Sequence, residues 1–131
     1  PNAIDDSVTT TENATVTVTS LSNDSDPEND TLTITGVSNT VGGGTAGFTG
    51  TDVTFDPGTD FDSLAVGDSA TVTFTYDISD GEGGSDTATV TITIDGENDT
   101  PGAIDDSATT TENASVTVAL LTNDSDPDND T

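Results

Sequence analysis

Carboxylates are the side chains of this sequence that are suited to strong ionic chemistry. The 131 residues include 26 Asp and Glu residues and no Lys, Arg, His or Cys, so the formal net charge is −26. Most of these acids are clustered in the polar connections between apolar segments. Densely placed like charges repel one another and destabilise a compact chain. Because no cationic side chain relieves this repulsion, the sequence predicts that multivalent cations hold the acidic connections together.

Calcium is the cation that these oxygen-rich connections favour. Ca²⁺ binds about six to eight oxygens, Mg²⁺ retains more of its water, and zinc or copper would call for His or Cys. The run from Asp24 to Asp30 resembles the start of an EF-hand loop, but Asn29 and Thr35 occupy the positions that need Gly and Glu. We therefore predict a half-site that needs ligands from elsewhere. The alternative is that the acidic loops only keep the protein soluble.

Several classes of function conflict with this composition. Nucleic-acid binding and attachment to anionic membranes both require Lys and Arg. The chain also lacks the His, Cys and Lys residues that most enzymes use as bases or nucleophiles. We expect no enzymatic activity, no nucleic-acid partner and no direct membrane contact. No apolar run is long enough to span a bilayer and no signal-peptide pattern opens the chain, so any export signal is expected elsewhere in a longer parent.

An internal repeat organises the chain. Residues 1–31 return as residues 101–131, with 24 of 31 positions identical. We expect residues 1–99 to form one complete domain. Residues 100–131 would then supply a linker and the opening strands of the next repeat, and they would be frayed, packed against the first domain or paired with another molecule.

Apolar residues and Thr alternate along several segments of the repeat. The pattern is clear in residues 14–19, 71–76 and 88–94, and Gly, Pro, Asn and Asp mark the breaks between such segments. Alternation with β-branched residues is typical of half-buried strands. About seven short strands in roughly 100 residues favour an all-β sandwich. The apolar content of 28% is low enough for a disordered acidic tail, but a disordered chain has no use for such regular alternation.

Several motifs of the repeat resemble those of a known family. Residues 74–101 are similar to the closing strands of bacterial cadherin-like and VCBS-type repeats, which occur in giant secreted RTX adhesins. Asn98-Asp99-Thr100-Pro101 resembles the Asn-Asp-x-Pro junction of that family. Thr11-Glu12-Asn13 resembles its Glu-Asn motif, Asp24-Ser25-Asp26 its Asp-x-Asp motif, and Asp80-Gly81 its acidic turn. The resemblance implies a Greek-key β-sandwich like that of cadherins and immunoglobulins.

The same resemblance implies several Ca²⁺ ions clustered at each junction between repeats. The ligands expected there come from the first domain, the linker and the next repeat: Glu12 with Asp60 or Asp62, then Asp95, Glu97, Asn98 and Asp99, then Asp124, Asp126 and Asp130. A half-site at the opposite end would face a preceding repeat and contain Asp24, Asp26 and Asp80. Asp105 and Asp106 lie just past the junction and are expected to join its cluster.

The function implied by the resemblance is that of a structural extender. Calcium would make the junctions rigid, so that tandem repeats form a stiff rod on a bacterial cell surface or on a secreted adhesin. The partners would be neighbouring repeats of the same polypeptide. Two other classes stay open, namely a self-associating filament subunit held by strand exchange and a carbohydrate-binding adhesive β-sandwich.

Overall fold

The computed structural model of the protein describes residues 1–129. Seven β-strands and one short 3₁₀ turn form within this part of the chain. The strands are β1 (Asp6–Thr11), β2 (Val16–Val18), β3 (Thr33–Val41), β4 (Thr45–Phe48), β5 (Val53–Asp56), β6 (Ser69–Ser79) and β7 (Ser85–Asp95), and the 3₁₀ turn η1 covers Ser20–Ser22. Within residues 1–129, no helix has the length and apolar character needed to cross a membrane.

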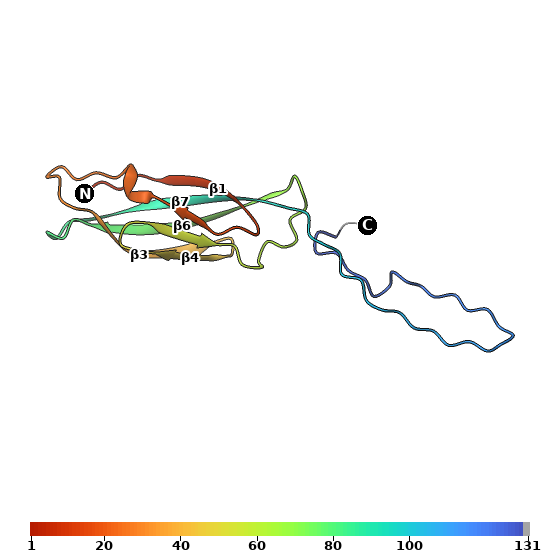
Figure 1. Ribbon diagram of the computed structural model, residues 1–131. Helices are drawn as coiled ribbons and strands as arrows, with labels where there is room; N and C mark the ends of the chain where they lie inside the picture. Colours follow the sequence, from red (N-terminus) through yellow and green to blue (C-terminus); the bar gives the residue numbers. More distant parts are fainter. Residues whose placement is uncertain (130–131) are drawn as a thin grey trace.

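The strands form two sheets that pack face to face (Figure 1). The larger sheet has the order β1-β7-β6-β3, and the smaller sheet has the order β2-β5-β4. Neighbouring strands are antiparallel, except that β1 runs parallel to β7. This arrangement is an immunoglobulin-like β-sandwich, and it confirms the all-β fold of about seven strands that the alternation predicted.

The alternation of β6 and β7 builds most of the core. These two strands pair along all 11 residues of each. Successive side chains of a strand point to opposite faces, so one face of the pair is apolar and the other carries Thr. The inward side chains are buried: Val72, Phe74, Tyr76, Ile78, Ala88, Val90, Ile92 and Ile94. From the smaller sheet, the Phe55 ring stacks on the Phe74 ring with centroids 6.3 Å apart.

Two strands were not evident from the sequence pattern. In β1 the apolar residue is Val8, surrounded by hydroxyl and acidic residues, and β4 contains Gly47. Both strands lie at sheet edges, where β1 pairs with β7 over six residues and β4 pairs with β5 over four. Pairing with strongly apolar neighbours therefore forms these strands, because their own alternation is too weak to indicate them.

Residues 101–129 form no strand and extend away from the sandwich as a long loop (Figure 1). The isolated bridge between Gly102 and Ser125 repeats the one between Asn2 and Ser25. Large apolar side chains of the segment are exposed, namely Ile104, Val116, Val118, Leu120 and Leu121. In the first repeat, β2 pairs with β5 and packs its valines against the core, whereas no strand among residues 1–129 pairs with 116–118. That residues 100–131 open a second repeat therefore stays a prediction.

Two glycines provide a matched test of the packing between the sheets. Gly44, before β4, has φ of +70°, and a Cβ atom there would collide with the Phe55 ring. Gly58 has φ of +62°, but a Cβ atom there would meet nothing within 4 Å. We expect Gly58→Ala to lower the free energy of unfolding by about 1 kcal/mol, from backbone strain alone. Gly44→Ala should cost about 3 kcal/mol because overpacking adds to that strain. Urea denaturation measures both losses, and equal losses would contradict the close packing of Phe55 on Gly44.

Candidate metal centre

Glu12 follows β1 at the end of the larger sheet and has a fully buried side chain. Its N–H donates to the Asp95 carbonyl at the end of β7, at 3.1 Å, which fixes its place beside the sandwich. Its Oε1 accepts a hydrogen bond from the Glu97 N–H at 2.8 Å. Its Oε2 is buried and has no hydrogen-bond partner. Since burying an ionised carboxylate without a partner is costly, this oxygen is well placed to bind a cation.

Asp128 approaches the same place from the far end of the chain. Its Oδ2 accepts a hydrogen bond from the Asp99 N–H at 2.8 Å, although 29 residues separate the two. Its side chain is 8% exposed, and its Oδ1 is buried without a partner. The contact with Asp99 joins the linker after β7 to the segment 101–129.

Glu12, Asp99 and Asp128 form a compact group of oxygen ligands. One carboxylate oxygen from each residue lies within 4.8 Å of the other two. Burial raises the pKa of the Asp99 carboxyl, and so do the neighbouring charges of Asp128, Asp62, Asp126 and Glu97. A group of carboxylate oxygens without nitrogen or sulfur ligands suits a hard cation such as Ca²⁺.

The structure brings together five of the acids expected at the junction, which are Glu12, Asp62, Glu97, Asp99 and Asp126. For three other expected residues, the structure shows a different role. Asp95 contributes its carbonyl to Glu12 and has an exposed side chain, and the Asn98 side chain donates to the Asp99 carbonyl at 2.6 Å. Asp60 accepts a hydrogen bond from the Gly44 N–H at 2.8 Å, so it supports the turn before β4.

Asp105 and Asp106 are not brought to this group. Both side chains are exposed in the loop that leaves the sandwich. Their counterparts Asp5 and Asp6 lie at the start of β1, and the Asn23 side chain of the Asp24 loop donates to Asp6 at 3.1 Å. That Asp105 and Asp106 join the junction cluster stays a prediction.

Asp128 was missed by reasoning from the sequence, which selected Asp130 instead. Asp130 lies outside the described residues. The signal that could have found Asp128 is the alternation of acids at positions 124, 126 and 128, which continues the Asp-x-Asp motif by one step. The same position in the first repeat is Glu28, so both copies carry an acid there.

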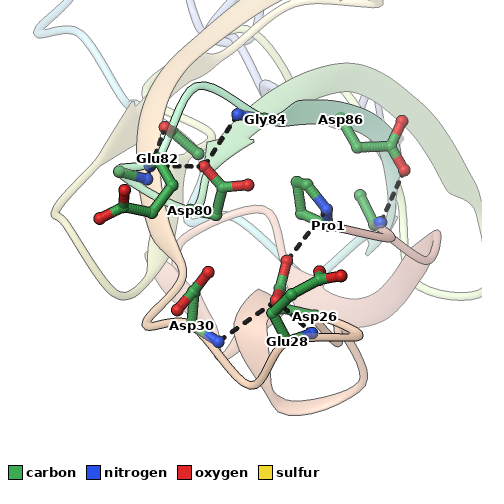
Figure 2. Close-up of polar contacts among 11 residues, drawn as sticks. Pro1, Asp26, Glu28, Asp30, Asp80, Glu82, Gly84 and Asp86 are labelled. Atoms are coloured by element: carbon green, nitrogen blue, oxygen red, sulfur yellow. Dashed lines mark hydrogen bonds and ion pairs between the residues drawn. The ribbon is translucent and has the colours of Figure 1, made fainter.

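The opposite end of the sandwich gathers the second set of expected ligands in part (Figure 2). Asp26 Oδ2 pairs with the Pro1 ammonium at 3.1 Å, and Asp26 Oδ1 accepts hydrogen bonds from the N–H groups of Glu28 and Asp30. Asp80 lies close enough for the ammonium to lower its pKa, but the main cause of that lowering is a hydrogen bond from the backbone of Glu82. Asp26 and Asp80 are therefore neighbours, as expected for a half-site.

Asp24 does not join them, because it is turned toward the interior of the sandwich. Its Oδ1 accepts from the Ile4 N–H at 2.7 Å, and both of its carboxylate oxygens lie within 3.1 Å of the Tyr76 hydroxyl. Burial, followed by the charges of Asp6 and Asp24, raises the pKa of Tyr76 well above its usual range. The Tyr76 hydroxyl therefore remains a hydrogen-bond donor that holds Asp24 in place.

The geometry defines an immunoglobulin-like β-sandwich with a group of carboxylates at the end of its larger sheet. A family model described as bacterial Ig domain matches residues 1–93, and the chain belongs to this family. No curated protein and no solved structure matches the chain. Bacterial Ig-like β-sandwiches are typically structural domains without enzymatic activity.

The lowered pKa of Asp86 leads us to expect that the stability of the protein depends on pH. Hydrogen bonds from the Ala3 and Thr87 backbones lower its pKa below the model-compound value of 3.8. A lowered pKa contributes stability that is present above pH 3.8 and is lost as the pH falls through the folded value. We expect Asp86→Asn to be less stable than the natural sequence at pH 7, and this difference in the free energy of unfolding to become smaller below pH 3.8. Urea denaturation across this pH range measures the difference. A difference that does not change with pH would contradict the lowered pKa of Asp86.

Proposed function

We propose that this protein is a calcium-binding extender unit of a bacterial surface protein, in which Ca²⁺ fixes the junction between consecutive repeats. One observation carries the proposal. Glu12 and Asp128 each have a buried oxygen without a hydrogen-bond partner, and both belong with Asp99 to a group of ligand atoms within 4.8 Å of one another.

The electrostatics of this group favour a bound cation. Two like charges at this separation repel by roughly 3 kcal/mol at an effective dielectric constant of about 20. No Lys, Arg or His exists in the sequence to oppose that repulsion. Ca²⁺ accepts several carboxylates and carbonyls in flexible geometry, whereas Mg²⁺ holds its waters more tightly. Calcium is therefore the cation that this group of ligands suits best.

The ligands come from three separate segments, and this gives the ion a structural effect. Glu12 follows β1, Asp99 lies in the linker after β7, and Asp128 lies in the segment 101–129. An ion shared by the three would tie that segment to the sandwich and would replace repulsion with attraction at the linker. Binding would also favour folding, because the unfolded chain does not hold these ligands together.

The proposal that the chain is a tandem repeat of a bacterial adhesin rests on sequence similarity. Membership of the bacterial Ig domain family suggests a surface-associated extender or adhesive domain. The similarity to cadherin-like and VCBS-type repeats, together with the close copy of residues 1–31 at 101–131, supports a tandem repeat of a secreted or cell-surface adhesin. Its partners would then be neighbouring repeats of the same polypeptide, with several Ca²⁺ ions at each junction.

The alternatives receive less support from the structure. Strand exchange between copies would require 106–111 to displace β1, which already pairs with β7 over six residues, so one pairing would be lost for each pairing gained. A sugar-binding surface usually presents aromatic rings, and Phe48 is the aromatic residue with a large exposed fraction. The two functions therefore remain second to the extender.

Removal of calcium tests the proposal directly. A ligand at 100 times its dissociation constant stabilises the folded state by about 2.7 kcal/mol. We expect the Tm of the chain to fall by several degrees when excess EGTA replaces saturating Ca²⁺, and the radius of gyration from small-angle scattering to increase as 101–129 is released. Mg²⁺ at the same concentration is the control and should restore less of the Tm. An unchanged Tm and radius of gyration in EGTA would refute the proposal.

Glu12→Gln separates the charge of the side chain from its shape. Gln retains an oxygen to accept from the Glu97 N–H but removes the negative charge beside Asp99 and Asp128. In EGTA the variant should be more stable than the natural sequence by about 1 kcal/mol or more, because repulsion is relieved. In saturating Ca²⁺ the order should reverse, because a ligand is lost. Denaturant titration in both buffers measures the two differences.

The matched control for this experiment is Glu82→Gln, which removes a charge from an exposed turn at the other end of the sandwich. It should change stability equally in both buffers. If Glu12→Gln behaved like this control, Glu12 would not be a calcium ligand.

A further inference from the structure

The loop that carries Asp128 has the same internal hydrogen bonds as its counterpart in the first repeat. The Asp128 N–H donates to Asp126 Oδ1 at 3.0 Å, and the Glu28 N–H donates to Asp26 Oδ1 at 2.9 Å. The residue that follows is Asn in each copy, with φ of 59° and 62°. One copy lies against a complete sandwich, whereas the other belongs to a segment that forms no strand. The conformation of this loop is therefore encoded locally.

Asp124 closes this loop onto the start of its segment. Its Oδ1 accepts a hydrogen bond from the Ile104 N–H at 2.8 Å, as Asp24 Oδ1 does from the Ile4 N–H at 2.7 Å. The backbone bridge between Gly102 and Ser125 lies directly beside this contact. Together these bonds join residues 102–104 to residues 124–125 as a small closed unit.

We infer that Asp124 is a positioning residue for the proposed calcium site and is not itself a ligand. This inference rests on the function proposed above. Asp124 orients its carboxylate toward Ile104, while Asp128, four residues later, faces Asp99. The Asp124 bond fixes the base of the loop, and the Asp126 bond to the Asp128 N–H fixes its tip.

Asp24 has the corresponding role at the opposite end of the sandwich. There the complete fold adds an anchor, because the Tyr76 hydroxyl donates to the Asp24 carboxylate from the core. Asp24 thereby connects the core to the loop in which Asp26 faces the Pro1 ammonium. The first acid of each Asp-x-Asp motif therefore supports the loop, and a later acid of the loop faces Asp99 in one copy and the Pro1 ammonium in the other.

The test uses the whole chain and compares three variants by calorimetric Ca²⁺ titration. Asp124→Asn keeps an oxygen that accepts from the Ile104 N–H but removes the charge, so its affinity should stay within about threefold of the natural sequence. Asp124→Ala removes the acceptor and should weaken binding about tenfold, the lower end of the effect of losing a partner that orients a metal ligand. Asp128→Asn removes a ligand and should weaken binding by more than tenfold.

A local readout accompanies the affinities. The temperature dependence of the Ile104 amide proton shift, measured by NMR in EGTA, reports whether this N–H is hydrogen-bonded in the absence of metal. It should indicate a bonded amide in the natural sequence and in Asp124→Asn, and a solvated amide in Asp124→Ala.

The outcomes are distinct. If Asp124→Asn weakens Ca²⁺ binding as much as Asp128→Asn does, Asp124 is a ligand and the inference is overturned. It is also overturned if Asp124→Ala leaves both the affinity and the Ile104 amide unchanged. If the natural sequence binds no Ca²⁺, the proposed function fails, and the Ile104 measurement in EGTA alone decides whether Asp124 holds the loop.

Discussion

The structure depends on how a chain without cationic side chains stabilises its carboxylates. At the N-terminal end of the sandwich, backbone N–H groups stabilise them. Each of Asp26, Asp80 and Asp86 accepts two hydrogen bonds from backbone N–H groups. Hydrogen bonds to a charged acceptor are stronger than those between neutral groups. At the other end, Glu12 and Asp128 each accept one such bond and keep a buried oxygen without a partner. The N-terminal end also has buried carboxylate oxygens without a hydrogen-bond partner, on Asp6 and Asp26, and there the Pro1 ammonium pairs with Asp26. Both ends therefore place carboxylate oxygens where a positive charge stabilises them.

The sequence was sufficient to predict the fold because the alternation in β6 and β7 is long and regular. A strand with period two and eleven residues can bury only one face, and two such strands define the interior of a sandwich. The position of Glu12 was also accessible, since it occurs in a short motif that resembles a known family. Features that depend on local chemistry or on strong periodicity were thus predicted well.

Features that depend on tertiary contacts were not predicted. Nothing in the residues of β1 indicates that it pairs in parallel with β7, a strand nearly 80 residues later in the chain. The orientation of Asp24 depends on the hydroxyl of Tyr76. The approach of Asp128 to Asp99 depends on a turn that is closed by bonds from the Asp128 and Asn129 N–H groups to Asp126. Counting acids in a loop identifies candidates, but it does not show which of them face inward.

The parallel pairing of β1 with β7 has a mechanical consequence. These strands carry the chain into and out of the sandwich at opposite ends, and they are joined over six residues (Figure 1). Tension applied along the polypeptide would pull β1 and β7 in opposite directions parallel to their axes. The hydrogen bonds between them would share this load in shear, so that the sandwich resists extension until several of them break together.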